Sequence, residues 1–153
     1  MTDTELVDAI VTGLRAYTTS PLSDMEVHAW SQMGYEDADG YVLVAPVAGE
    51  EWSQAIGPHT AAGYVLMDDL RIGIRAVIAF ADTSANRLAV ETMCQQLRYW
   101  LRTNRQVTAG AQTTQAAMNV AWTYGTMGDE QSPYLKRYCE VQVTYRKPVE
   151  AVS

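Results

Sequence analysis

The segment Arg137–Lys147 constrains the fold most, because its side chains alternate between two faces along its whole length. Successive side chains of an extended strand point to opposite faces, so this pattern predicts a strand with one buried face. The inward set is Cys139, Val141, Val143 and Tyr145, and the outward set is Tyr138, Glu140, Gln142 and Thr144. Pro148 ends the strand. A strand of this length needs partner strands, so the chain must build a sheet.

The segment Arg71–Ala81 predicts a second long strand by the same pattern, and Arg75 lies on its outward face. Its inward set is Ile72, Ile74, Ala76, Ile78 and Phe80. Shorter strand-like runs are Tyr64–Met67 and Val120–Thr126. We expect Gly128–Pro133 to form a turn before the last strand.

A hairpin is predicted from Glu26–Met33 and Tyr41–Ala45, because the acidic and glycine-containing segment Gly34–Gly40 lies between them. Within that segment, Asp37-Ala-Asp39-Gly40 departs from the spacing of a calcium-binding loop, so we interpret it as an acidic turn. The neighbouring carboxylates Asp68 and Asp69 are also interpreted as a turn.

Residues 4–17 predict an amphipathic helix, because apolar residues recur every three to four positions. Its apolar stripe is Leu6, Ile10, Leu14 and Tyr17. Thr2 and Glu5 have the spacing of a capping box at the helix start. Thr18-Thr19-Ser20-Pro21 ends the helix, since the residue before a proline avoids the helical region.

A second helix is predicted from Asn86 to Thr103, preceded by the potential capping residues Asp82-Thr83-Ser84. Its apolar stripe is Val90, Met93, Cys94, Leu97 and Leu101. Arg98, Arg102 and Arg105 lie near its end, where the helix dipole favours positive charge.

The order of helix, strands, helix and strands predicts a single α+β domain over residues 1–153. We expect a largely antiparallel sheet with one face covered by the two amphipathic helices. The segments Pro46–Ala62 and Val107–Asn119 are predicted to be long loops. We expect both to be mobile in the free subunit and to become ordered on contact with neighbours.

The composition limits the classes of function. The two cysteines, the acidic N-terminal residues and the lack of a long apolar stretch favour an intracellular protein without a membrane span. The formal net charge of −7 disfavours stable binding to nucleic acid, which needs clustered Lys and Arg. The acidic balance fits either simple solubility or a surface past which DNA slides without binding.

The sequence contains no arrangement typical of catalysis or metal binding. His28 and His59 stand apart, and Cys94 and Cys139 fall on inward stripes, where cysteine behaves as a small apolar residue. A Cys–His nucleophile pair is the less favoured interpretation. Phosphate-binding, dinucleotide-binding and nucleophile-elbow motifs are missing, so we expect no catalytic residue, no metal ligand and no cofactor.

The four tryptophans are scattered and not interleaved with basic residues, so they do not predict a base-stacking platform. We expect Trp30, Trp100 and Trp122 to lie in the core. Trp52 lies in a polar loop beside Glu50 and Glu51. It is either an interface anchor or packed against its own domain.

The whole-chain pattern resembles the tail terminator, or tail-completion, proteins of long-tailed bacteriophages. The resemblance rests on the N-terminal helix, the strand Ile72–Phe80 running into the helix Ser84–Thr103, and the closing strand Val141–Lys147. It implies a virion structural protein of the tail and neck, assembled in the host cytoplasm. Such proteins form a hexameric ring that caps the tail tube, stops its growth and meets the head connector. The partners implied are further copies of the chain, the tail tube protein and the connector, with DNA passing through the lumen unbound.

Expected interface residues are Trp52, Glu50, Glu51, Gln112 and Gln115, all within the two predicted loops. Two alternatives remain open at this point. One is a head-completion, neck or minor tail protein. The other is a small enzyme or ligand-binding domain without a recognisable motif, with a polar pocket around His28 or Cys139.

Overall fold

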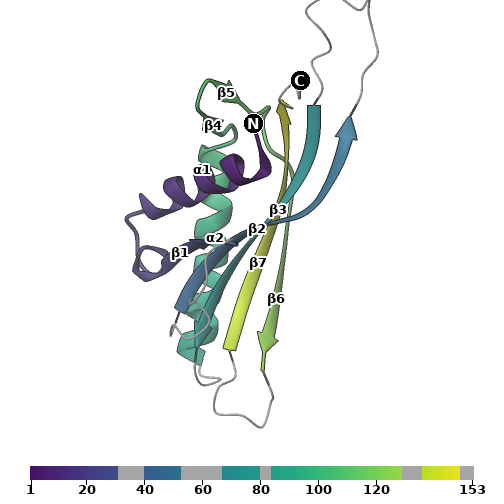
Figure 1. Ribbon diagram of the computed structural model, residues 1–153. Coiled ribbons are helices and arrows are strands. Elements are labelled where there is room, and N and C mark those ends of the chain that lie inside the picture. The colour runs from purple at the N-terminus through teal and green to yellow at the C-terminus, as the bar shows by residue number, and fades with distance from the viewer. Residues whose placement is uncertain (31–39, 53–66, 80–83, 129–135, 149–153) are drawn as a thin grey trace, which may run out of the picture.

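The computed structural model describes residues 1–30, 40–52, 67–79, 84–128 and 136–148. The elements in chain order are α1 (Asp3–Arg15), η1 (Leu22–Asp24), β1 (Glu26–Ala29), β2 (Gly40–Trp52), β3 (Met67–Ala79), α2 (Ser84–Thr103), β4 (Thr108–Ala109), β5 (Gln112–Thr113), β6 (Met118–Met127) and β7 (Lys136–Pro148). Figure 1 shows both long helices on one side of the sheet. The α+β class predicted from the sequence is therefore confirmed.

The main sheet has the strand order β1-β2-β3-β7-β6, and all its pairs except β1–β2 are antiparallel. The predicted inward residues of β3 and β7 lie opposite one another, as in the pairs Ile74–Val141 and Ala76–Cys139. All four are fully buried beneath the helices. The apolar side chains at every second position of β3 and β7 therefore form the part of the core that the sheet contributes.

The helices supply the other side of the core. The capping box of Thr2 and Glu5 is present at the start of α1, which ends at Arg15, two residues before the predicted end. The predicted stripe of α2 is buried, and Leu97 at its centre is fully enclosed. Gly13 lets α1 approach α2, because a Cβ atom there would lie 2.6 Å from the Trp100 ring.

The expected hairpin of the first two strands is wrong, because β1 runs parallel to β2. In the observed register, Val27 lies beside Val42 and Ala29 beside Val44, and all four are buried. An antiparallel pair would satisfy the same alternation. Side-chain patterns show which face is buried but do not fix strand direction. The segment Gly34–Asp39 and its acidic turn lie outside the described residues.

Strands β2 and β3 are longer than predicted. Pro46–Trp52, expected to be loop, continues β2 with a register shift between Pro46 and Ala48. The predicted turn at Asp68 and Asp69 is wrong, because both residues belong to β3 and lie opposite Lys147 and Arg146 of β7. Oppositely charged neighbours keep these carboxylates in an extended strand.

The predicted loop Val107–Asn119 contains the small β4–β5 hairpin and the start of β6. Val107 donates its backbone N–H to the hydroxyl of Thr114, and Thr114 is buried. The segment therefore packs on the body of the protein through backbone and hydroxyl contacts, which hydrophobic periodicity does not detect. Within the described residues, no helix combines the length and apolar character needed to cross a membrane.

Candidate interaction surface

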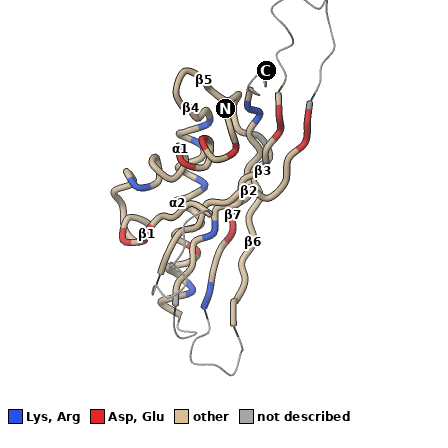
Figure 2. The backbone as a smooth tube through the Cα atoms, in the orientation of Figure 1, with Lys and Arg blue, Asp and Glu red and all other residues tan. Residues whose placement is uncertain are grey.

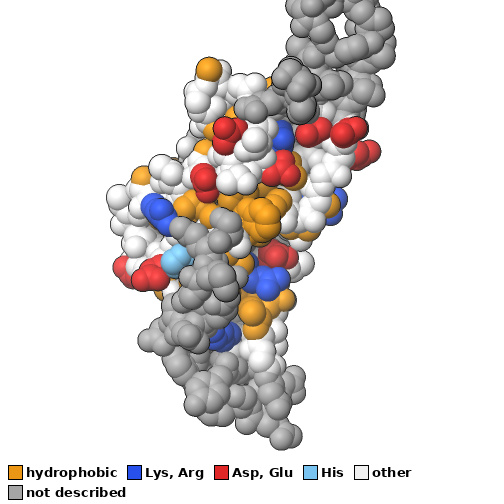
Figure 3. Space-filling model, viewed as in Figure 1, with side chains coloured by type: hydrophobic (Ala, Val, Ile, Leu, Met, Phe, Trp, Pro, Cys, Tyr) orange, Lys and Arg blue, Asp and Glu red, His pale blue; other side chains and the backbone are white. Residues whose placement is uncertain are grey.

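The distal ends of β2 and β3 form an acidic arm, which we define as Ala48–Trp52 with Met67–Asp69. The arm projects past the helices (Figure 1), and the red stretches of the backbone tube in Figure 2 mark acidic residues at this end of β2 and β3. Glu50 lies opposite Asp69 and Glu51 opposite Asp68. Figure 3 shows acidic side chains gathered where the arm leaves the body. Glu50 and Glu51 are exposed, so the arm presents negative charge outward.

Two acidic residues at the base of the arm, Asp68 and Asp69, lie opposite the basic residues Lys147 and Arg146 of β7. Arg146 donates from Nε and Nη2 to the two carboxylate oxygens of Asp69, at 2.7 and 2.9 Å. This hydrogen bonding holds the pKa of Asp69 below its ordinary value of 3.8, although partial burial opposes the shift. The ion pair fixes the arm to β7 at neutral pH.

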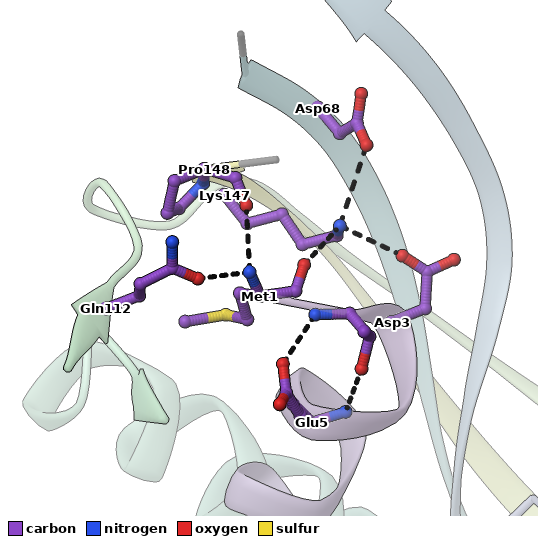
Figure 4. A network of polar contacts seen from close by, with 8 residues as sticks. Met1, Asp3, Glu5, Asp68, Gln112, Lys147 and Pro148 are labelled. Atoms are coloured by element: carbon purple, nitrogen blue, oxygen red, sulfur yellow. Dashed lines mark hydrogen bonds and ion pairs between the residues drawn. The ribbon is translucent and has the colours of Figure 1, made fainter. Parts of the chain in front are cut away.

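On the opposite side of the sheet, Lys147 joins three segments of the chain (Figure 4). Its buried amine donates to the Met1 carbonyl at 2.9 Å and lies 3.1 Å from Asp3 Oδ1 and 3.6 Å from Asp68 Oδ2. The amino group of Met1 donates to Gln112 Oε1 and to the Pro148 carbonyl. These contacts tie the start of α1 and the β4–β5 hairpin to the base of the arm.

The structure brings the backbone positions of all five expected interface residues toward one end of the sheet. Glu50 and Glu51 are in the arm, Gln112 bonds to Met1, and Gln115 donates its backbone N–H to the Arg146 carbonyl at 2.8 Å. The backbone of Trp52 pairs with Met67 at the outer end of the arm, and its side chain lies outside the described part. Gln112 serves a contact within the chain, whereas the Gln115 side chain is exposed.

A second surface, which the sequence did not predict, lies along the edge strand β6 and the adjacent side of α2. Trp122 is 43% exposed and Tyr124 53% exposed, on the helix-bearing side of the sheet. The guanidinium of Arg98 lies 3.5 Å from the centroid of the Trp122 ring. We call this the β6–α2 surface. The prediction of a core position is wrong for Trp122 and for the 49% exposed Trp30, but right for the buried Trp100.

Two hollows flank the Arg98–Trp122 pair. One, of about 400 Å³, is lined by Arg87, Val90, Glu91, Tyr124, Gly125, Arg137 and Tyr138. The other, of about 380 Å³, is lined by Leu101, Arg102, Arg105, Ala117 and Val120. Both hollows are lined by apolar side chains and arginines, and the first also contains Glu91.

Of the candidate reactive residues, His28 and Cys139 do not form a catalytic pair. Burial raises the pKa of the Cys139 thiol to about 12, which keeps it protonated near neutral pH. His28 contacts Glu26 at 3.1 Å on β1, and strands β2 and β3 separate it from β7. Three strand spacings correspond to about 14 Å, too far for proton transfer. His59 lies outside the described residues.

Among the described residues, no group of three or more His, Cys, Asp or Glu side chains is arranged to hold a metal ion. No protein-family model and no curated protein matches this sequence.

Proposed function

We propose that this chain is a tail terminator of a long-tailed bacteriophage. It forms a hexameric ring on the end of the tail tube, stops further growth of the tube and joins the tail to the head connector. The resemblance described from the sequence suggests this role, and the confirmed α+β class is compatible with it.

The observation that supports the proposal most is the state of the two sheet edges. Among the described residues, β6 pairs with β7 alone, and β2 pairs with β1 only over Tyr41–Val44. A subunit with an unpaired edge on each side has a contact available for each of two neighbours. Contacts that repeat head to tail close into a ring when the rotation between subunits permits it.

The charge of the chain supports the same role. With a formal net charge of −7, a ring of this protein repels the phosphate backbone. DNA leaving or entering the head then passes the lumen without being held. The acidic arm also offers a surface that extends beyond the helices toward another component, such as the tail tube protein or the connector.

A gene knockout tests the proposal directly. Phage lacking this gene should produce tubes of uncontrolled length, or tails that do not join filled heads, as seen by electron microscopy of the lysate. Supplying the wild-type gene in trans should restore normal particles. Normal-length tails attached to heads in the knockout lysate contradict the proposal.

One observation favours a second candidate, a ligand-binding domain. The hollow of about 400 Å³ beside Tyr124 has the size of a small-molecule site and contains Arg87, Arg137 and Glu91. A knockout with intact particles, together with a small molecule that raises the melting temperature of the pure protein, would favour this candidate over the tail terminator.

A further inference from the structure

Strand β6 lacks the protection that edge strands of isolated proteins usually carry. The ten residues Met118–Met127 include no Lys, Arg, Asp, Glu or Pro. Residues 121–124 are exposed on both faces of the sheet. Natural proteins guard such edges with charges, prolines or covering segments, because an open edge pairs with other strands. An unguarded edge with half-exposed aromatic side chains is therefore suited to a partner.

The C-terminal end of α2, which forms the helix wall beside β6, is basic. Arg98 lies over Trp122, and Arg102 and Arg105 are exposed at the same end of α2. Neither Arg102 nor Arg105 has a side-chain partner among the described residues. In a chain of net charge −7, this concentration of positive charge favours an acidic partner.

The outer edge of β2 supplies a surface of opposite sign. Beyond Val44, this edge has no strand partner within the described ranges. It carries Glu50 and Glu51, which are exposed and have no described ion-pair partner. By register with Asp68 and Lys147, Glu51 lies on the helix-bearing side of the sheet, the same side as the three arginines.

The two surfaces lie toward the same end of the molecule. Glu51 is level with Lys147 of β7, and Met118 of β6 is level with Thr144. Three residues along a strand span about 10 Å, within the combined reach of Glu and Arg side chains. Arg105 is located at that end of β6, because its carbonyl accepts a hydrogen bond from the Ala117 backbone N–H at 2.6 Å. Copies placed side by side at equal height thus bring the acidic edge of one toward the basic wall of the next.

We infer that the β6–α2 surface, with Arg102 and Arg105, binds the outer edge of β2, with Glu50 and Glu51, of a second copy of this chain. The inference rests on the ring proposed above and assigns its subunit contact. A two-fold pairing of β6 with β6 would leave Glu50 and Glu51 outside the contact, so Arg102 and Arg105 would not meet these two carboxylates. Complementary charge favours the head-to-tail contact, which is the kind that closes into rings.

Paired charge reversals test the contact. We expect E50K/E51K and R102E/R105E each to weaken self-association by about tenfold or more, as measured by analytical ultracentrifugation. An equimolar mixture of the two variants should restore association, because in an alternating ring each reversed arm meets a surface of opposite charge. D8K, at an exposed position on α1, is the control and should associate like the wild type. Thermal melting checks that each variant is folded.

Wild-type association should also weaken as salt rises from about 50 mM to about 500 mM, since screening acts on exposed charge pairs. The salt dependence of wild-type association tests the proposed contact even if a variant does not fold. Association that is independent of salt overturns the inference. So does unchanged association of either folded reversal, or a mixture that fails to recover.

The association measurements also distinguish failure of the assigned subunit contact from failure of the proposed ring. If the wild type forms rings and both charge-reversed variants form them equally well, the assigned contact is wrong but the ring proposal stands. A wild-type chain that neither associates at high concentration nor caps purified tail tubes overturns the ring itself, and the contact with it.

Discussion

The guanidinium carbon of Arg98 lies over the indole of Trp122 on the edge strand β6, 3.5 Å from the ring centroid. The indole is 43% exposed on this edge strand, and the cation–π contact stabilises it against α2. A large aromatic side chain fixed in one orientation loses little conformational entropy on binding. The pair therefore forms a preorganised centre for the β6–α2 surface.

Trp122→Ala should weaken self-association by about tenfold or more, because central aromatic residues dominate interface energies. The free energy of unfolding should change by only about 1 kcal/mol, since the ring is half exposed. Sedimentation and urea unfolding measure the two effects. Leu88→Ala, which truncates a 64% exposed side chain near the start of α2, is the control and should leave association unchanged. A loss of association equal in both variants would argue against a specific role for Trp122.

Acid should destabilise the protein through Asp69. The folded-state pKa of this carboxyl is lower than its ordinary value of 3.8, because Arg146 donates two hydrogen bonds to it. The stabilising contribution is therefore complete above pH 3.8 and is lost as the pH falls through the folded-state pKa.

Asp69→Asn should reduce the free energy of unfolding by about 1 kcal/mol at pH 7 and show a weaker acid dependence than the wild type. Urea unfolding at a series of pH values measures this. Parallel pH profiles for the two proteins would show that Asp69 does not contribute in this way.

The thiol of Cys139 should be inert in the folded protein. It is fully buried, and its raised pKa of about 12 keeps it from ionising at pH 8. A thiol reagent should label Cys94 and Cys139 at pH 8 only after denaturation, because Cys94 is also fully buried. Rapid labelling of Cys139 in the native state would indicate an accessible nucleophile and favour the enzyme alternative.

The packing of α2 on the sheet is tested at Leu97. Its side chain is fully buried, so Leu97→Asp places an unpaired carboxylate in the core and should cost about 3 kcal/mol or more. The matched variant Leu88→Asp makes the same change at a 64% exposed site on the same helix. Its melting temperature should stay within a few degrees of the wild type. Equal melting temperatures for the wild type and Leu97→Asp would show that the helix does not pack as described.

The core was predictable from the sequence because its signal is periodic. Alternation in β7 and the stripe of α2 identified Val141, Val143 and Leu97 as buried, and all three are fully enclosed. The direction of β1 was not predictable, since Val27 and Ala29 face inward in either orientation.

The interaction surfaces were harder to predict, because they depend on contacts between distant segments. The local sequence Asp68-Asp69 is typical of a turn. Its place in a strand becomes clear only from the sheet pairing, which puts Lys147 and Arg146 opposite the two carboxylates. Trp122 is of a residue type common in cores, and its exposure follows from its place on the edge strand β6, which the residue type does not reveal. One local signal was available in the sequence, namely the uncharged run Met118–Met127, which marks an unguarded edge strand.

Trp52 remains the aromatic residue most suited to docking at the outer end of the acidic arm. Its backbone pairs with Met67, the first residue of β3, at a distance from the helices that cover the core. Trp52→Ala should therefore leave the melting temperature near that of the wild type but weaken ring formation or attachment to tail tubes. Sedimentation reports the first effect, and electron microscopy of purified tubes mixed with the variant reports the second. Tyr99→Ala, on the exposed side of α2, removes a comparable aromatic ring far along the chain from the arm and should dock normally. If Trp52→Ala instead unfolds the protein, Trp52 packs against its own domain and is not the docking residue of the arm.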